Sequence, residues 1–425
     1  MCRAACGCPR LMNFQKPYPP RMVVLIIACI SASIQTSFAE QETSPIVTDR
    51  MDSGIQGDVE TVPVAPLVRQ DQVKHDGWEL GTLISAAYDS NIFLSSSKPT
   101  SDMVFRIGPV IAYSTSDSTT GEGGFIKVAY HPTAVIYATN NSDNRIDHQA
   151  LLTAGWRGKV IQLTYKGAIQ KLGDATADTG RLTDRVEFEN ELRAAWRPRE
   201  KITLEWAIGN QQSDYSDPTL FSSNKTYTEI ASRYAYSPKT QIGLAYQVAQ
   251  FKVLGSPDHD TQQLTGAIDW QPREKIRILL KAGAEYRKVA NDSQINPVLE
   301  SRVEWTSREG TSVYITAYQR QETSAYYAGQ IYNAKGVTAG ISQRLSEKWA
   351  TRLETGFEKA TYSQVSGSGA SGRSDRIWFV RPALEYKISD ESNIAVFYRV
   401  SNDSSSDPAF GYAQHMAGIE FVYKF

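Results

Sequence analysis

The chain is poor in three features that define other classes of protein: cysteine, long apolar runs and an excess of charge of one sign. All four cysteines lie within the first 29 residues. The 45 Lys and Arg residues nearly match the 46 Asp and Glu residues, so no excess of positive charge favours binding to nucleic acid. No apolar run reaches the roughly 20 residues of a membrane-spanning helix, which argues against a helical membrane protein.

Residues 1–39 have the organisation of a secretory signal peptide. Basic residues between Arg3 and Arg21 precede a short apolar run, and Ser37-Phe38-Ala39 then supplies the small residues that signal peptidase requires. We expect cleavage between Ala39 and Glu40. The apolar run is too short for a membrane anchor, which is the less favoured interpretation.

Two alternatives remain open in this part of the chain. Translation could start at Met1 or at Met12, and a lipoprotein acylated at Cys29 is a weaker interpretation because it would leave an apolar stretch in the mature chain. After cleavage at the expected site, the mature chain has no cysteine. An exported protein without disulfide bonds must be stabilised in another way, and a closed hydrogen-bonded β-barrel is one.

Residues 40–76 are polar, acidic and interrupted by prolines, so we expect a flexible periplasmic segment. From residue 77 onward, apolar and polar residues alternate in segments of about a dozen residues. The clearest segment, Arg185 to Trp196, has an apolar side and a charged side. A period of two excludes a helix, and the core of a soluble protein could not accommodate the charged side.

Roughly 18 such segments follow one another to Phe425. Tight links follow most even-numbered segments and longer polar links tend to follow odd-numbered ones, as in outer-membrane barrels. The last segment, Phe410–Phe425, has an aromatic face and is expected to pair with the segment that begins at Trp78. A β-propeller is less favoured, because its strands are shorter and carry no one-sided aromatic belt.

Residues 77–425 are therefore predicted to form one all-β domain. We expect a transmembrane up-and-down antiparallel β-barrel of about 18 strands with a polar lumen. Its expected location is the outer membrane of a Gram-negative cell, with the N- and C-termini in the periplasm.

Aromatic residues recur at the ends of even-numbered segments, just before the tight links. The chain has 22 Tyr and 8 Trp residues, and such rings collect at membrane interfaces. The segment near Leu345 lacks a ring at this position. We predict a periplasmic aromatic girdle made of Tyr113, Trp156, Trp196, Tyr236, Trp270, Trp305, Tyr386 and Phe425.

Charged residues of both signs are interleaved on the side of the segments that is expected to face the lumen. Such interleaving favours ion pairs between adjacent strands and does not form the single-sign ring that gives strong ion selectivity. The lumen-facing candidates are Arg185, Glu187, Glu189, Glu191, Arg193, Arg277, Lys281, Glu300, Arg302, Glu304, Arg352, Glu354, Arg381 and Glu385.

The sequence contains no strong pattern for a catalytic or metal-binding site. The five histidines have no metal-ligand spacing, and Asp258-His259-Asp260 is better explained as a solvated acidic loop than as a cation site. A serine beside His131 or His148 would be needed for a barrel hydrolase, and the sequence does not single one out. We therefore predict no enzyme, no catalytic residue, no metal and no cofactor.

The stretch Tyr88-Asp89-Ser90-Asn91-Ile92-Phe93, followed by Asp102-Met103-Val104-Phe105-Arg106-Ile107-Gly108-Pro109, resembles the porin 2 type of outer-membrane β-barrel porins. This family is associated with loci for exopolysaccharide biosynthesis and export. The resemblance covers about residues 77–425 and implies a barrel connected with polysaccharide secretion. At the outer mouth, Asp89 and Phe93 could touch sugar rings, but roles in the turn and in an aromatic belt explain them at least as well.

From this resemblance we expect a porin-like conduit or a structural component in the export of a surface polysaccharide. The alternatives are a general diffusion porin for small hydrophilic solutes and a barrel enzyme that acts on lipid or lipopolysaccharide. Expected partners are outer-membrane lipid, lipopolysaccharide, the barrel assembly machinery, polysaccharide and export-system proteins; nucleic acid is not expected.

Overall fold

The computed structural model describes residues 77–425 apart from 116–121, 290–291, 307–309, 328–330 and 364–371. The predicted signal peptide, with its cleavage site between Ala39 and Glu40, and the segment 40–76 lie outside these residues. Within them the chain forms antiparallel strands and one short 3-10 helix, η1 (Asn141–Asp143). No helix in this part of the chain has the length and hydropathy needed to span a membrane.

Eighteen long strands belong to one sheet, and two short strands form a separate hairpin. The long strands are β1 (Gly77–Asp89), β2 (Asp102–Ser114), β3 (Gly123–Tyr137), β4 (Arg145–Arg157), β5 (Ile161–Leu172), β8 (Arg185–Arg199), β9 (Ile202–Tyr215), β10 (Ser223–Ser237), β11 (Thr240–Val253), β12 (His259–Arg273), β13 (Ile276–Val289), β14 (Asp292–Thr306), β15 (Thr311–Thr323), β16 (Ile331–Arg344), β17 (Trp349–Ser363), β18 (Ser374–Lys387), β19 (Ser392–Ser405) and β20 (Tyr412–Lys424). The hairpin consists of β6 (Ala175–Thr176) and β7 (Arg181–Leu182).

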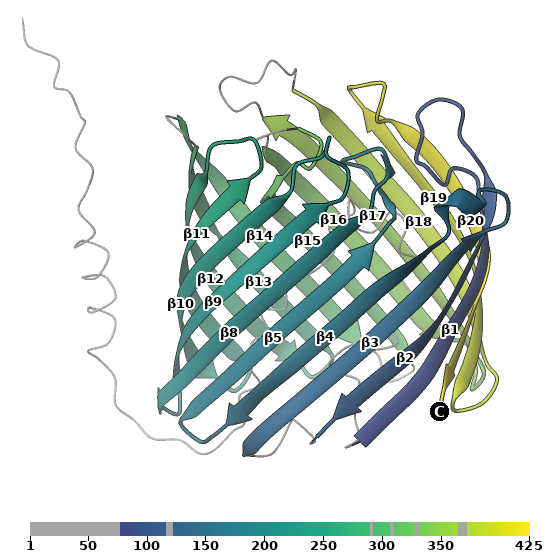
Figure 1. Ribbon diagram of the computed structural model, residues 1–425. Helices are drawn as coiled ribbons and strands as arrows, with labels where there is room; N and C mark the ends of the chain where they lie inside the picture. Colours follow the sequence, from purple (N-terminus) through teal and green to yellow (C-terminus); the bar gives the residue numbers. More distant parts are fainter. Residues whose placement is uncertain (1–76, 116–121, 290–291, 307–309, 328–330, 364–371) are drawn as a thin grey trace, which may run out of the picture. The chain divides into compact units, whose positions relative to one another are not determined.

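The long strands close into a ring (Figure 1). Each pairs antiparallel with the next one in the chain, β5 pairs with β8, and β20 pairs with β1 in a register from Gly81 opposite Lys424 to Asp89 opposite Met416. Among the described residues, every long strand has a partner on both sides over at least part of its length, so most backbone donors and acceptors are satisfied inside the sheet. The prediction of an all-β barrel of about 18 strands, closed by its last strand against its first, is confirmed.

Side chains alternate between the two faces of the wall, as the pleat of a strand requires. On β2, Met103, Phe105 and Ile107 are exposed on the outer face, whereas Val104 and Arg106 are buried on the inner face. The same alternation recurs around the ring and leaves large apolar side chains on the outside of the barrel. An apolar exterior around a polar interior is the arrangement of a barrel that sits in lipid.

The two ends of the barrel differ. One end, which we call the turn end, carries short links such as 158–160, 200–201 and 274–275, and the C-terminal residue lies there (Figure 1). The other, the loop end, carries the longer connections, including 90–101, 173–184 and 406–411. The link between β2 and β3, which is long for a turn-end link, lies largely outside the described residues.

Large rings are exposed at the turn end: Trp156, Trp196, Tyr236, Trp270, Trp305 and Phe425. Two further girdle candidates pack against rings that the pattern did not single out. Tyr113 lies 4.9 Å from Trp78, and Tyr386 lies 4.7 Å from Trp349, measured between ring centroids. Trp349 is the first residue of β17, so it supplies the ring that is missing at Leu345, on the strand that follows the turn.

Closure of the ring predicts a specific crosslink. Ala86 and Ile419 are direct partners on β1 and β20, so the double variant Ala86→Cys with Ile419→Cys should form a disulfide on mild oxidation. We expect a faster-migrating band on a non-reducing gel, and mass spectrometry should identify the linked peptides.

The matched control is Ala86→Cys with Val396→Cys. Val396 is the partner of Ile419 on β19, so it is two strands from Ala86, roughly 10 Å and beyond the reach of a disulfide. Equal crosslinking of both pairs, or of neither, would contradict the closed ring.

Candidate functional site: the interior of the barrel

The inner wall carries charged side chains that neutralise one another across several strands. On β8, the guanidinium of Arg193 binds Glu191 at 2.9 Å and also reaches Glu205 of β9 at 3.0 Å and Glu229 of β10 at 3.2 Å. Arg233 of β10 binds Glu205 at 2.6 Å. Two arginines thus hold three carboxylates on three neighbouring strands.

A second group of ion pairs lies on β12, β13 and β14. Arg277 binds Asp269 at 2.8 Å, and Lys281 faces Glu300 at 3.9 Å. Nearer the loop end, Arg287 binds Glu285 at 2.8 Å through Nε, while its two terminal nitrogens are buried without a hydrogen-bond partner in the described structure.

A third group lies on the strands that complete the ring. Arg352 of β17 binds Glu385 of β18 at 2.6 Å, and Arg381 of β18 binds Glu420 of β20 at 2.8 Å, although β19 separates the last two strands. The Tyr314 hydroxyl of β15 donates to Glu354 of β17 at 2.6 Å. Long side chains therefore bridge over an intervening strand along the inner wall.

Each lumen-facing candidate has a polar partner, but not all the partners are on adjacent strands as expected. Several pairs join residues two apart on one strand, which point to the same face. These same-strand pairs are Arg185 with Glu187 (2.7 Å), Arg193 with Glu191 (2.9 Å) and Arg302 with Glu304 (2.6 Å). Glu189 accepts a hydrogen bond from Gln211 at 2.6 Å.

The connection between β5 and β8, residues 173–184, folds into the barrel. Its hairpin of β6 and β7 turns at Gly180, which adopts a φ of 63° that favours glycine. Ala175 and Ala177 are each only 1% exposed. The neighbouring Asp174 forms an ion pair with Arg185, the first residue of β8. The longer polar links, of which Lys171–Thr183 is one, are expected outside the barrel as in other outer-membrane barrels. For this link the expectation is wrong, because residues 172–179 are buried.

The tip of this connection is anchored to strands on the far side of the ring. The carboxylate of Asp178 accepts hydrogen bonds from the Ser324 hydroxyl (2.8 Å), the Ala325 amide (2.6 Å) and the Tyr362 hydroxyl of β17 (3.0 Å). Arg373, just before β18, donates to the backbone carbonyls of Ala177 and Asp178 at 2.6 and 2.9 Å.

Eight strands separate β8 from β17 in one direction around the ring, and six separate β5 from β18 in the other. A connection that starts at β5 and is held beside β17 and β18 must therefore cross from one side of the ring to the other, at the loop end where its partners lie. We call residues 173–184 the crossing segment.

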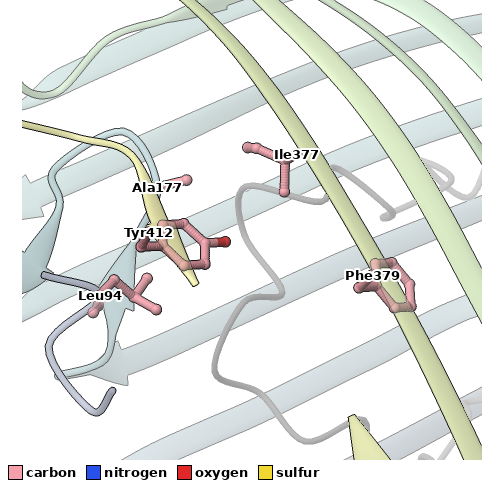
Figure 2. Packing of buried hydrophobic residues seen from close by; sticks show 6 residues of the cluster. Leu94, Ala177, Ile377, Phe379 and Tyr412 are labelled. Carbon is pink, nitrogen blue, oxygen red and sulfur yellow. The ribbon is translucent and has the colours of Figure 1, made fainter. Parts of the chain in front are cut away.

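Other connections of the loop end pack on the crossing segment. Figure 2 shows Leu94, Ala177 and Tyr412 together, with Ile377 and Phe379 of β18 in the same buried cluster. Leu94 comes from the connection between β1 and β2, and Tyr412 is the first residue of β20. This apolar cluster joins segments that are far apart in the sequence.

A second contact is aromatic and centres on Phe410. The guanidinium of Arg373 lies 3.6 Å from the centre of the Phe410 ring, and Tyr326 meets the same ring edge-on at 4.8 Å. Tyr327 donates to Asp407 at 3.4 Å, and burial raises the pKa of the Tyr327 phenol, so it stays a neutral donor. Connections after β1, β5, β15 and β19 thus meet over the interior.

The Tyr88–Phe93 stretch, at the end of β1 and the start of the connection to β2, has a structural role. Asp89 is 2% exposed and accepts hydrogen bonds from the Asn91 amide (2.8 Å) and from Gln414 of β20 (2.9 Å). The Asn91 side chain in turn donates to the Ser95 and Ala413 carbonyls. Asp89 therefore fixes a turn beside the closing strand and is not open to a sugar.

Other candidate positions show no reaction centre. His259 is fully buried whereas Asp258 and Asp260 are exposed, so these three side chains do not face one ion. His131 and His148 have Thr133 and Tyr130 as hydrogen-bond partners, neither of which is a serine. Among the described residues, no group of three or more His, Cys, Asp or Glu side chains could hold a metal ion.

No protein-family model and no curated protein matches the chain. Solved structures that resemble it include OccK3 (OpdO) of Pseudomonas aeruginosa, with a TM-score of 0.44, 11% identity and coverage of 82% of this chain and 95% of that one. OccAB4 of Acinetobacter baumannii matches with a TM-score of 0.46 and 9% identity, covering 84% of this chain and 100% of that one. The outer membrane protein OpdK of Pseudomonas aeruginosa matches with a TM-score of 0.43 and 10% identity, covering 82% of this chain and 99% of that one. Likeness at this level assigns neither a family nor a substrate.

The anchor of the crossing segment gives a measurable prediction. Asp178→Ala should speed hydrogen exchange of the amides in β6 and β7 by about tenfold or more, because losing hydrogen bonds to a charged group costs about 1.5–3 kcal/mol. Exchange measured by mass spectrometry on the purified barrel would test this. The control is Asp390→Ala, an exposed carboxylate at the turn end. If both variants exchange like the wild type, the anchor does not hold the segment.

Proposed function

We propose that the protein is an outer-membrane diffusion channel for small hydrophilic solutes, narrowed by the crossing segment. The observation that carries the proposal is a closed ring with an apolar exterior and a charge-paired interior, into which residues 173–184 are folded. A ring of about this many strands encloses an aqueous channel unless its own segments fill it.

The balance of charge on the wall suits solutes of either sign. Arg193 and Arg233 are compensated by Glu191, Glu205 and Glu229, and the groups on β12–β14 and β17–β20 are arranged in the same way. A wall of this kind offers hydrogen bonds to a hydrated solute and imposes no strong field of one sign. We therefore propose passage with weak charge selectivity.

The expectation of polysaccharide export has the sequence resemblance as its support. The crossing segment is anchored at both sides of the ring, so a polymer would need it to be released, whereas a small solute needs only a gap beside it. None of the interior contacts described above favours a polymer. Small solutes are accordingly the cargo that we propose.

The 18-stranded barrel with its apolar exterior supports an outer-membrane location. We propose that the turn end, where β1 begins and β20 ends, faces the periplasm, that both ends of the mature chain lie in the periplasm, and that the loop end faces outward. Short turns inside and longer connections outside are usual for such barrels.

Electrical recording tests the proposal directly. Purified barrels in a planar bilayer should give stepwise conductance, and liposomes that contain them should admit sugars at rates that fall with solute size. Replacing residues 174–182 by a short Gly-Ser link should raise the conductance several-fold, because the interior is then unobstructed. Liposomes that stay impermeable to every small solute, with or without the segment, would refute a diffusion channel.

Charge pairing on the wall predicts the effect of removing carboxylates. Glu205→Gln with Glu229→Gln leaves Arg193 and Arg233 with less compensation, so chloride should permeate several-fold better relative to potassium. The shift of the reversal potential should be larger at 0.1 M than at 1 M salt, because the Debye length falls from about 10 to 3 Å. Glu347→Gln, which removes an exposed carboxylate in a turn, is the control. An unchanged reversal potential in the double variant would show that solutes do not pass this wall.

A further inference from the structure

Three basic residues form a row on the outside of the barrel near the loop end. Lys335 of β16 is the direct partner of Lys359 on β17, and Lys359 is the direct partner of Arg376 on β18. All three side chains are exposed on the outer face. We call them the cationic row.

Among the described residues, the direct neighbours of the cationic row on the outer face carry no compensating charge. Its neighbours at either end are Gln319 of β15 and Ser404 of β19, both uncharged. Within the described part of the chain, none of the three basic side chains forms an ion pair or a hydrogen bond with another residue. Like charges directly opposite each other destabilise a sheet, so this arrangement favours an anion between them.

Acidic residues do adjoin the row in the sequence, but they point inward. Glu358 precedes Lys359 and is 1% exposed, and Asp375 precedes Arg376 and is fully buried. The pleat of the strands places these carboxylates on the opposite side of the wall. The sequence of the connection between β17 and β18 contributes no acidic residue either, since residues 364–371 have none.

The outer-face residues on either side of the cationic row place it at a boundary between apolar and polar surface. Two residues toward the turn end, Val337, Phe357 and Trp378 are direct partners of one another and about 40–45% exposed on the same outer face. Two residues toward the loop end, the partners are the uncharged polar residues Asn333, Thr361 and Ser374. Apolar, cationic and polar rows thus follow one another, which is the order of acyl chain, headgroup and water.

We propose that Lys335, Lys359 and Arg376 bind the phosphate groups of lipopolysaccharide in the leaflet around the loop end. Strand spacing gives the row a span of roughly 10 Å, which suits a headgroup with more than one phosphate. Acyl chains of the same molecule would lie along Val337, Phe357 and Trp378. The choice of lipopolysaccharide over a phospholipid rests on the proposed outward orientation of the loop end, and it is independent of conduction.

Native mass spectrometry of the purified, delipidated barrel tests the site, with bisphosphorylated lipid A as the probe. The triple variant Lys335→Gln, Lys359→Gln and Arg376→Gln should bind lipid A about tenfold or more weakly than the wild type. The matched control is Lys171→Gln, Lys252→Gln and Lys288→Gln, which removes three exposed outer-face lysines from separate strands near the same end. Heat-modifiable migration on a gel verifies that each variant is folded.

Lipid A without phosphate groups should bind the wild type as weakly as intact lipid A binds the triple variant. Equal binding of lipid A by the wild type and the triple variant would overturn the proposal. Equal loss in both triple variants would also overturn it, because any removal of charge would then suffice. Tighter binding of phosphatidylglycerol than of lipid A would assign the row to phospholipid instead. None of these binding measurements depends on conductance. A negative result in the conductance experiment would therefore leave the test of the lipid site unaffected.

Discussion

Backbone pairing between β20 and β1 is the constraint on which the other features depend. In a hydrocarbon environment an unpaired strand edge leaves donors and acceptors unsatisfied, so the sheet has to return to its own first strand. Once the ring is closed, the pleat assigns every side chain to one of two environments. Apolar residues such as Phe105 and Ile107 then face outward, and charged residues such as Arg106 face inward. The polar interior and the lipid-facing belt are consequences of the same closure.

The interior solves an electrostatic problem that closure creates. Charged groups that face the same enclosed space repel one another, or are left without a partner, unless positive and negative charges are matched. Arg193 meets three carboxylates from three strands, and Arg381 reaches over β19 to Glu420. Arginine suits this task because its planar fork carries several donors on a long stem. The matching extends around the wall and requires no single strand to be neutral by itself.

Much of this architecture could be predicted from the sequence, because the alternation of residues is a local signal that each strand carries by itself. The strand order and the closing pair follow from that alternation and from the short links. Trp349 was missed because it begins a strand, whereas the other rings were sought at strand ends. The crossing segment was missed because its anchors are distant: Asp178 meets Ser324 at a separation of 146 residues and Arg373 at 195. A polar stretch with small residues looks the same in sequence whether it lies outside the barrel or inside.

Those separations have a consequence for the order of folding. Contacts between residues so far apart form late, since the chain between them must first be arranged. The partners of Asp178 belong to β17 and to the connections before β16 and before β18. Its hydrogen bonds therefore cannot form before that part of the wall exists. Residues 173–184 can therefore reach their final position only after β17 and the connections before β16 and β18 are in place, whatever the order in which the strands join. Loss of that part of the wall would release the crossing segment although its own flanking strands, β5 and β8, remained paired.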